Sequence, residues 1–321
     1  MGEFDLIERY FKKPVRHADL GIGDDCALLS ATPGHQLAIS TDMLVEGRHF
    51  LSTVQPKHLG HKALAVNLSD LAACGARPKA FLLSLAMPRA DTQWLEGFSQ
   101  GLFALAQQHG CELIGGDTTQ GPLNISITVL GEVPQGQALL RSGAQAGDDL
   151  YVSGTVGDAR LALEALRGHI SLPEAVFNAA RARMETPTPR VQLGMALRGI
   201  ASAAADISDG LLGDLGHILK ASGVGARIEW PLAASLMGSC RAWPCPSTLM
   251  QTCVLSGGDD YELVFTAPAA CREQVTAAAA QAQTPVTRIG TLVTGSGIEV
   301  FDARGQLLSG PFASFDHFAA S

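Results

Sequence analysis

The sequence predicts an α/β protein of two domains. A chain of 321 residues is long for a single hydrophobic core, so we expect two domains of about 150 residues each. Strand-like and helix-like segments alternate along the chain. Both halves place aspartates where a strand ends and a helix begins, although no convincing internal repeat accompanies this similarity.

The composition is that of a globular protein with many tight turns. Hydrophobic residues make up 46% and charged residues 17%, which excludes a disordered chain. The net charge of −8 argues against a nucleic-acid surface, yet bound divalent cations would let an acidic site accept a phosphorylated substrate. No apolar run approaches the roughly 18 residues of a membrane span, and the first residues lack the pattern of a secretory signal.

The seven cysteines indicate a reducing compartment. They form no Cys-x-x-Cys pair, and their odd number fits free thiols better than a disulfide framework. Cys240 and Cys245 are the closest pair, but no second pair or histidine couple accompanies them, so ordinary thiols are favoured over a zinc site. We therefore expect a cytoplasmic protein without nucleic-acid or membrane partners.

Apolar spacing and capping residues predict the elements of the N-terminal half. The expected elements are a strand over Gln36–Ser40, a helix over Pro56–Cys74, a helix from Asp91 to Gln108, and strands over Cys111–Ile114 and Asn124–Val133. Asp91 is a good N-cap, and Gly110 is suited to end the helix that it opens.

The domain boundary is expected near residue 145, because the chain from Pro134 to Gly147 is polar and rich in glycine. This gives an N-terminal domain over 1–145 and a C-terminal domain over 146–321. The elements expected in the second domain are a strand at Leu150–Val152, a helix from Asp158 to Arg167, a loop through Pro187 and Pro189, a helix from Arg190 to Ile200, a helix opened by Asp206–Gly210 and running to Ser222, strands near Ala226–Trp230, Tyr261–Thr266 and Val286–Leu292, and an alanine-rich helix between the last two.

Short acidic clusters set among glycines and hydroxyl residues indicate a metal-dependent site. They are Asp24-Asp25, Thr41-Asp42, Ser69-Asp70, Asp117-Thr118, Asp206/Ser208/Asp209 and Asp259-Asp260. Two like charges about 4 Å apart repel by roughly 4 kcal/mol at an effective dielectric near 20, so gathered carboxylates need cations. Hard oxygen ligands favour Mg²⁺, which commonly binds together with substrate phosphates. The clusters therefore predict a magnesium-dependent phosphoryl-transfer enzyme.

Each cluster also has a structural interpretation. Gly21–Asp25 lacks the later glycine of a dinucleotide fingerprint, no P-loop lysine motif occurs, and an isolated Gly-Asp-Asp is more often a turn. Asp206 and Asp209 would share one face of a helix start, but a helix cap with a spare carboxylate fits equally well. The glycines of Ser256–Glu262 permit close approach of backbone to a ligand, or a hairpin turn.

Three residues outside the acidic clusters are further candidates. The guanidinium of Arg141 suits a bidentate phosphate contact, although a solvated surface arginine is the commoner case. His49 could contact a substrate or belong to a loop. Phe312 could give an aromatic platform, although a phenylalanine near a C-terminus is more often packed.

Together these segments resemble the thiamine-monophosphate kinase family, whose superfamily also contains aminoimidazole ribonucleotide synthetase and selenophosphate synthetase. The resemblance runs almost end to end. The segments that carry it are Gly21–Leu28 (GIGDDCAL), Ile39–Asp42 (ISTD), Lys62–Ala73 (KALAVNLSDLAA), Leu113–Thr119 (LIGGDTT), Arg141–Ala144, Asp206–Leu211 (DISDGL), Asp214–Ser222 (DLGHILKAS), Ser256–Leu263 (SGGDDYEL) and Phe315–Phe318 (FDHF).

The resemblance implies an aminoimidazole ribonucleotide synthetase-like fold. The N-terminal domain would bind ATP and Mg²⁺ and pair its sheet with a second copy in a homodimer, while the α/β C-terminal domain would complete the active site. The implied reaction transfers the γ-phosphoryl group of ATP to the phosphate of thiamine monophosphate, giving thiamine diphosphate and ADP.

The resemblance also implies roles for individual residues. The implied magnesium ligands are Asp25, Ser40, Thr41, Asp42, Asp70, Asp117, Asp206 and Asp209. The implied ATP contacts are Gly116, Asp117, Arg141 and Ser208, and the implied thiamine-site residues are His49, Asp259 and Phe312. Family members often carry Glu where Asp259 stands and a larger aromatic residue where Phe312 stands.

The reaction needs no strong general base, because the acceptor phosphate oxygen is already ionised at neutral pH. We accordingly assign no catalytic acid or base, and expect direct in-line transfer assisted by several Mg²⁺ ions. Two alternatives remain: another ATP-dependent member of the superfamily, and a non-catalytic module that binds a metal–nucleotide complex. No cysteine precedes Cys26 and the chain ends in Ala320-Ser321, unlike the cysteines expected of selenophosphate synthetases and hydrogenase-maturation relatives.

Overall fold

The computed structural model describes residues 2–308 and 310 of the chain. It divides the chain into two compact units, which we call unit 1 (residues 1–71 and 76–136) and unit 2 (residues 72–75 and 137–321). Each unit contains its own β-sheet with helices packed against it. None of the described helices is long and apolar enough to cross a membrane.

Unit 1 is built on a four-stranded sheet in the order β1-β4-β2-β3. The strands are β1 (His35–Val45), β2 (Arg77–Met87), β3 (Glu112–Gln120) and β4 (Asn124–Pro134). Only the β2–β3 pair is parallel; β4 pairs antiparallel with both β1 and β2. Along β4 buried and half-buried residues alternate, which is the pattern of a strand with one face on a core.

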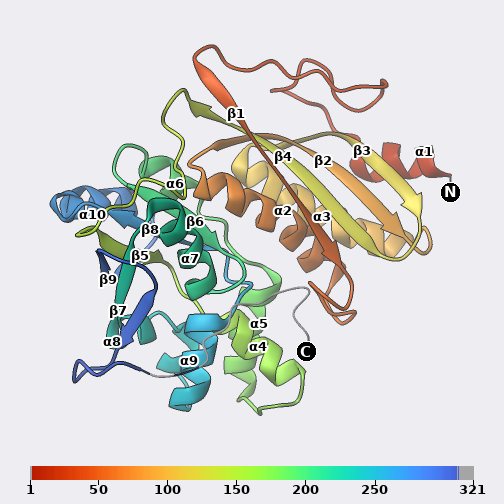
Figure 1. Cartoon of the computed structure of the whole chain (residues 1–321). Helices are drawn as coiled ribbons and strands as arrows, with labels where there is room; N and C mark the ends of the chain where they lie inside the picture. The colour runs from red at the N-terminus through yellow and green to blue at the C-terminus, as the bar shows by residue number, and fades with distance from the viewer. Residues whose placement is uncertain (1, 309, 311–321) are drawn as a thin grey trace. The chain divides into compact units, whose positions relative to one another are not determined.

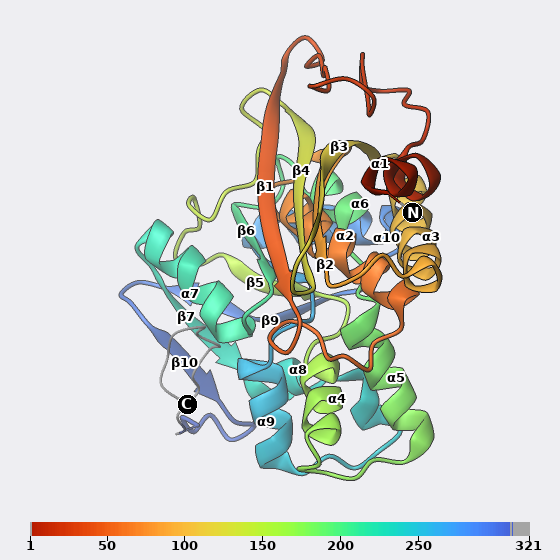
Figure 2. The same ribbon diagram turned by 90° about the vertical axis from the view of Figure 1, so that its right-hand side faces the viewer.

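The helices α2 (Pro56–Ala73) and α3 (Thr92–His109) lie along one face of this sheet, as Figures 1 and 2 show. They pack closely through glycines: a Cβ on Gly101 would lie 1.8 Å from the carbonyl oxygen of Lys57. The short helices α1 (Glu3–Leu6) and η1 (Ile7–Phe11) precede the sheet in the chain.

The predicted ends of α3 are confirmed. The Asp91 carboxylate accepts hydrogen bonds from the backbone N–H groups of Gln93 and Trp94, both at 3.1 Å. Gly110 follows the helix with φ of 60°, a left-handed conformation that glycine adopts without steric cost. The strands β1 and β3 are longer than predicted, because the acidic segments at their ends also pair with neighbouring strands.

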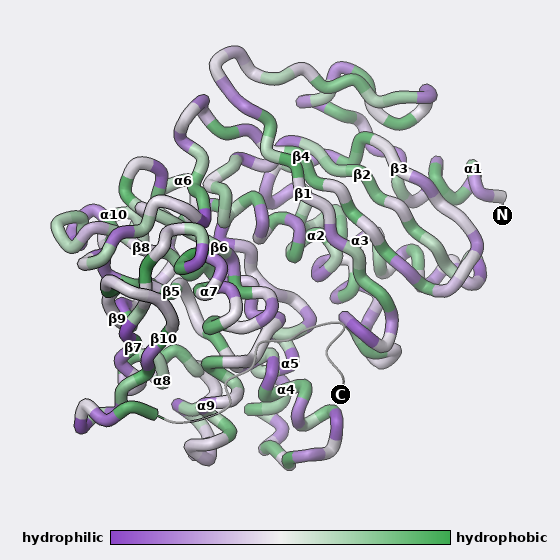
Figure 3. The backbone as a smooth tube through the Cα atoms, viewed as in Figure 1, coloured by the Kyte–Doolittle hydropathy of each residue, from purple (hydrophilic) through white to green (hydrophobic). Residues whose placement is uncertain are grey.

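Unit 2 is built on a six-stranded sheet in the order β10-β7-β9-β5-β8-β6. The strands are β5 (Asp149–Ser153), β6 (Ala203–Ile207), β7 (Gly225–Glu229), β8 (Glu262–Ala267), β9 (Val286–Val293) and β10 (Ile298–Phe301). Every residue of β5, β6 and β8 is buried, so both faces of this part of the sheet are covered. Figure 3 shows stretches of hydrophobic residues within the strands.

Some helices of unit 2 differ from those predicted from the sequence. They are α4 (Asp158–Leu166), α5 (Glu174–Glu185), α6 (Val191–Ala196), α7 (Leu211–Ser222), α8 (Trp230–Ala234), η2 (Gly238–Arg241), α9 (Ser247–Ser256), η3 (Ala269–Cys271) and α10 (Arg272–Gln281). α5 occupies a region predicted as loop, and α6 is shorter than the helix predicted over Arg190–Ile200. α5 is polar on average, so it has a weak sequence signal although Val176, Ala180 and Met184 bury one side of it.

Candidate active site

In unit 1, one group of candidate oxygen ligands lies between β1 and α2. The Ser40 hydroxyl donates a hydrogen bond of 2.5 Å to the Asp70 carboxylate, which joins the edge strand to the helix. Asp42 lies two residues after Ser40 and therefore on the same face of β1. Its backbone N–H donates to the side-chain oxygen of Asn67 at 3.1 Å. The structure thus places Ser40, Asp42 and Asp70 on the helix-facing side of β1.

Thr41 belongs to the opposite face of the same strand. Its hydroxyl donates to the backbone oxygen of Ile127 at 3.1 Å and accepts from the Thr128 hydroxyl at 3.1 Å. Alternation along the strand separates the Thr41 side chain from those of Ser40 and Asp42.

Gly116 and Asp117 lie within β3, at the other edge of the sheet. Gly116 has φ of 146°, and a Cβ there would lie 1.9 Å from the Leu83 carbonyl oxygen, so only glycine fits. Pairing places Asp117 in the row of Ser84, whereas Asp42 lies in the adjacent row, with Ile127. The Asp117 side chain is exposed and lies on the face opposite to Asp42, about 14 Å away across three strand spacings.

Asp25 lies in the loop between η1 and β1. Its side chain is exposed, and its backbone N–H donates to the neighbouring Asp24 carboxylate at 2.9 Å. The preceding Gly23 has φ of 136°, which permits the turn. The C-terminal end of this loop is anchored to the sheet by Glu132, whose carboxylate accepts from both the backbone N–H and the hydroxyl of Thr32, at 2.7 and 2.8 Å.

His49 lies in the loop after β1 and is half-buried. Its Nδ1 accepts a hydrogen bond of 3.0 Å from the backbone N–H of Val45, which places the proton of the neutral ring on Nε2. The buried Lys62 of α2 donates to the His49 backbone oxygen at 3.3 Å. The loop therefore holds the histidine ring in one orientation.

Arg141, at the start of unit 2, is exposed. Its backbone oxygen accepts a hydrogen bond of 3.2 Å from the Ser222 hydroxyl at the end of α7. The side chain is thus available to an anion while its backbone is held.

The segment Asp206–Gly210 corrects one prediction: Asp206 and Asp209 do not share a helix start. Asp206 is buried within β6, and α7 begins only at Leu211, after Gly210 with φ of 120°. Instead, the carboxylate of Asp214 accepts hydrogen bonds from the backbone N–H groups of Ser208, Asp209 and Gly210, at 3.0, 3.1 and 3.1 Å. Those amides would otherwise be unsatisfied at the helix start.

The Asp214 carboxyl is buried, and its ionisation reflects two opposing influences. Burial and the nearby negative charge of Asp209 raise its pKa to about 6, while the three amide hydrogen bonds act in the opposite direction. Asp214 therefore holds the loop that contains Ser208 and Asp209, a structural role that the spacing rules missed.

The segment Ser256–Glu262 divides into one half-buried carboxylate and two buried ones. Asp259, with φ of 68°, donates its backbone N–H to the Ser208 oxygen at 2.9 Å, and its carboxylate accepts from the Tyr261 hydroxyl at 3.0 Å. A Cβ on Gly258 would lie 2.4 Å from the Ser208 oxygen. The close approach that this glycine permits is thus between two loops of the chain itself.

Asp260 and Glu262 are internal anchors and not ligands. The Asp260 carboxylate accepts from the Gly157 backbone N–H at 2.9 and 3.0 Å, and burial raises its pKa well above the ordinary value. Glu262 pairs with Arg183 at 2.8 Å and with Arg190 at 2.6 Å. The assignment of the whole Asp259-Asp260 pair to a metal-dependent cluster was therefore wrong for Asp260.

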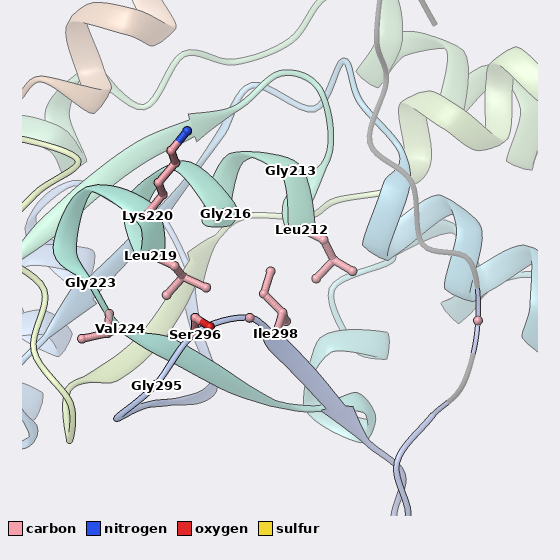
Figure 4. A pocket seen from close by; sticks show the side chains of 12 residues that line it. Leu212, Gly213, Gly216, Leu219, Lys220, Gly223, Val224, Gly295, Ser296 and Ile298 are labelled. Carbon is pink, nitrogen blue, oxygen red and sulfur yellow. The ribbon is translucent and has the colours of Figure 1, made fainter. Parts of the chain in front are cut away.

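Phe312 lies outside the described residues. Among those that are described, no group of three or more His, Cys, Asp or Glu side chains is gathered so as to hold a metal ion. A cavity of about 720 Å³ in unit 2 contains none of the predicted site residues. Leu212, Leu219 and Ile298 face it, while the Lys220 side chain extends away, as Figure 4 shows.

Comparison with known proteins defines the family. The model for the N-terminal domain of AIR synthase related proteins matches residues 23–133, and the model for their C-terminal domain matches residues 145–303. The thiamine-monophosphate kinase of Salmonella typhimurium (strain LT2) is 46% identical, and the alignment covers 99% of this chain and 98% of that protein. The enzyme of Escherichia coli (strain K12) is 45% identical with the same coverage.

The chain belongs to the thiamine-monophosphate kinase family. The crystal structure of thiamine-monophosphate kinase from Stenotrophomonas maltophilia K279a matches with a TM-score of 0.83 and 45% identity, covering 91% of this chain and 92% of that chain. The structure of AaThiL complexed with AMPPCP and TMP matches with a TM-score of 0.76 and 30% identity, covering 99% of this chain and 97% of that chain. The predicted family and the two-domain α/β fold are thereby confirmed.

Proposed function

We propose that the protein is a thiamine-monophosphate kinase, which transfers the γ-phosphoryl group of ATP to the phosphate of thiamine monophosphate. The observation that carries this function is identity of 45–46% with thiamine-monophosphate kinases along 99% of the chain. A relative of the same fold, AaThiL, is solved in complex with AMPPCP and TMP. Both substrates are thus assigned from the family, and the positions of the residues support their roles.

Mg²⁺ is the cofactor that the oxygen groups fit. Ser40, Asp42 and Asp70 present a hydroxyl and two carboxylates from one side of β1, and Mg²⁺ in enzymes is usually held by one or two carboxylates together with substrate phosphates. When bound, Mg²⁺ would offset the repulsion between the two negatively charged substrates. Asp25 of unit 1 and Asp206 and Asp209 of unit 2 are further proposed ligands. Thr41 and Asp117, which were also predicted as ligands, lie on the face of the unit 1 sheet opposite to Ser40, Asp42 and Asp70, so they would not bind the same ion as that group.

The remaining proposed roles are contacts that hold the two substrates in place. Arg141 would bind an ATP phosphate, because its guanidinium is exposed and always charged. Gly116, Asp117 and Ser208 would contact ATP, while His49, Asp259 and Phe312 would line the thiamine site. No side chain need remove a proton, since the attacking phosphate oxygen is already ionised. Transfer is therefore direct and in line, with no phosphoenzyme.

The outer face of the unit 1 sheet supports the proposal of a homodimer. Leu37, Ile39 and Met43 of β1 are 41%, 62% and 52% exposed on the face opposite to the helices. A row of large apolar side chains on a sheet face favours burial against a second copy. Asp117 lies on this same face, so its contribution to a site would depend on the dimer.

Sedimentation of Ile39→Asp tests this arrangement. The account expects a monomer for this variant and a dimer for the unsubstituted protein and for Gln108→Asp, a substitution at an exposed position of α3, which lies on the opposite face of the sheet. A dimer of unchanged affinity in Ile39→Asp would exclude this face.

We assign the N-terminal domain, residues 1–145, to ATP and Mg²⁺ binding and to dimerisation, and residues 146–321 to completion of the site. The cytoplasm is the proposed location, because all seven cysteines are free thiols.

Product analysis with thiamine monophosphate as sole acceptor tests the function. Equal amounts of ADP and thiamine diphosphate should form in the presence of ATP and Mg²⁺, and free thiamine should give neither. ADP without thiamine diphosphate, or no ADP, would exclude the kinase and favour another superfamily activity or a binding module.

A further inference from the structure

Asn67 of α2 is a buried amide to which none of the proposed roles is assigned. The residue is 1% exposed. Its side-chain oxygen accepts a hydrogen bond of 3.1 Å from the backbone N–H of Asp42, and its side-chain nitrogen donates to the backbone oxygen of Ala63 at 3.0 Å. Because a backbone N–H can only donate and a carbonyl oxygen can only accept, these partners fix the orientation of the amide. Both ends of the Asn67 side chain are therefore engaged by the chain itself.

The helix that carries Asn67 is packed firmly into the core of unit 1. Every residue from 62 to 69 is buried. At Gly60 the helix approaches α3 so closely that a Cβ would lie 2.0 Å from the carbonyl oxygen of Phe98. Asn67 and Asp70 are three residues apart on α2 and so lie on the same side of the helix. The packing of α2 therefore fixes these two residues together, independently of β1.

β1 depends more on its individual contacts, because it is an edge strand that, among the described strands, pairs with β4 alone. At Asp42 the backbone is held from two sides: its N–H binds Asn67 of α2, and its oxygen accepts from the Ser126 hydroxyl of β4 at 3.2 Å. A further contact, from Ser40 to Asp70, joins two proposed ligands, so a bound cation would compete for the same oxygens. The Asn67 contact uses the backbone N–H of Asp42, and therefore does not compete with a cation for a carboxylate.

The relative position of two carboxylates matters more to Mg²⁺ than to Ca²⁺. Mg²⁺ requires near-ideal octahedral geometry with oxygens at about 2.0–2.1 Å, whereas Ca²⁺ accepts flexible arrangements of oxygens at about 2.3–2.6 Å. Selectivity between the two ions therefore depends on how rigidly a site holds its ligands. In unit 1 the proposed ligands come from two elements, Asp42 from β1 and Asp70 from α2, and the Asn67 contact joins these elements.

We propose that Asn67 is a positioning residue that gives the unit 1 site its preference for Mg²⁺ over Ca²⁺. It acts through Asp42: its amide oxygen holds the Asp42 backbone at a fixed distance from α2, and thereby fixes the Asp42 carboxylate relative to that of Asp70. Loss of this oxygen lets β1 shift against the helix, which Ca²⁺ tolerates better than Mg²⁺ does. The inference rests on the proposed function in one respect, because it takes Asp42 and Asp70 as ligands of a divalent cation.

Asn67→Leu tests the inference, because leucine is similar in volume but its side chain neither accepts nor donates a hydrogen bond. Mn²⁺ is bound to the protein in the presence of a non-hydrolysable ATP analogue, displaced by Mg²⁺ or by Ca²⁺, and followed by electron paramagnetic resonance. The ratio of the Ca²⁺ to the Mg²⁺ concentration that displaces half of the Mn²⁺ does not depend on the affinity for Mn²⁺. We expect this ratio to fall by about 3- to 30-fold in Asn67→Leu. An unchanged ratio would overturn the proposal.

Leu105→Ala is the matched control. Leu105 is 2% exposed in α3, a helix of the same unit that carries no proposed ligand, so its truncation loosens the core of unit 1. This variant should lose thermal stability but keep the ratio of the unsubstituted protein. A ratio that falls as far in Leu105→Ala as in Asn67→Leu would indicate general loosening and overturn the role of Asn67. If Asn67→Leu does not fold, Asn67→Ala, which also lacks the amide but adds no bulk, takes its place.

The same measurement separates this inference from the proposed function. Ion displacement needs no phosphoryl transfer, so if the protein makes no thiamine diphosphate, the proposed function fails while the ratio still decides the role of Asn67. If the unsubstituted protein binds no Mn²⁺ beyond that held by the ATP analogue alone, the metal site itself is excluded, and the role of Asn67 is excluded with it.

Discussion

The two units present their acidic residues in different ways. In unit 1 the carboxylates of Asp42, Asp70 and Asp117 project from a strand, a helix and a second strand. In unit 2 the candidate ligands Ser208 and Asp209 lie in a loop whose backbone is held by the buried Asp214. The comparison teaches that regular structure decides which face of the sheet each carboxylate occupies, whereas an acidic loop contains both exposed residues and the anchors that hold them.

The largest effect is expected from the unit 1 group. Asp70→Asn keeps an oxygen that can accept from Ser40 but removes a charge needed by a divalent cation, so kcat/KM should fall by about 100-fold or more with little change in stability. Steady-state kinetics and thermal unfolding measure the two quantities.

The matched control is Asp19→Asn, because Asp19 accepts a hydrogen bond from Ser30 at 2.7 Å in the same unit but is not a proposed ligand. It should retain full activity. Near-normal turnover in Asp70→Asn would remove Asp70 from the metal site.

The next prediction distinguishes the residue that holds the unit 2 loop, Asp214, from the proposed ligand in that loop, Asp209. Asp214→Ala leaves the amides of Ser208, Asp209 and Gly210 without their acceptor, and should lower the free energy of unfolding by about 2–3 kcal/mol and reduce kcat/KM. Asp209→Asn should reduce activity while leaving stability unchanged. Denaturant titration distinguishes them, and equal stability of Asp214→Ala and the unsubstituted protein would refute the anchoring role.

Much of this arrangement could be predicted from the sequence. Apolar periodicity and caps such as Asp91 and Gly110 predict α2, α3, β4, β5 and β8, whereas β6, which carries Asp206, is not among the predicted elements. The local sequence pattern was enough to single out the acidic segments, because each places aspartates among glycines or small hydroxyl residues.

The remainder depends on contacts between distant residues. The residues around Asp260 in the sequence give no sign that its carboxylate accepts a hydrogen bond from the backbone N–H of Gly157, 103 residues away. The faces of Asp42 and Asp117 depend on strand pairing, including the irregular register between β2 and β3. Asp214 could have been found, since an acidic residue in the first turn of a helix is stabilised by the helix dipole and lies close to the free amides of the helix start.

An effect on stability without a direct effect on the site is expected where unit 1 anchors its own loop. Burial alone would raise the pKa of Glu132, but hydrogen bonds from Lys79, Thr32 and Arg77 hold it at about 2. Because this value lies below that of the unfolded chain, the stabilisation is complete above about pH 4.5 and is lost as the pH falls toward 2.

Glu132→Gln should therefore lower the free energy of unfolding by about 2–3 kcal/mol at neutral pH, and the difference should shrink below pH 4.5. Denaturant titrations at several pH values measure it. Glu299→Gln, at an exposed position of β10, should show no such dependence. A difference for Glu132→Gln that stays constant down to pH 3 would contradict the ion-pair account.

Binding of Mn²⁺ in the presence of a non-hydrolysable ATP analogue, followed by electron paramagnetic resonance, tests most directly whether carboxylates of each unit hold the divalent ions. Asp70→Asn in unit 1 and Asp209→Asn in unit 2 should each weaken Mn²⁺ binding by about 10-fold or more, while Asp19→Asn should bind as the unsubstituted protein does. Unchanged Mn²⁺ affinity in both ligand variants would contradict the account.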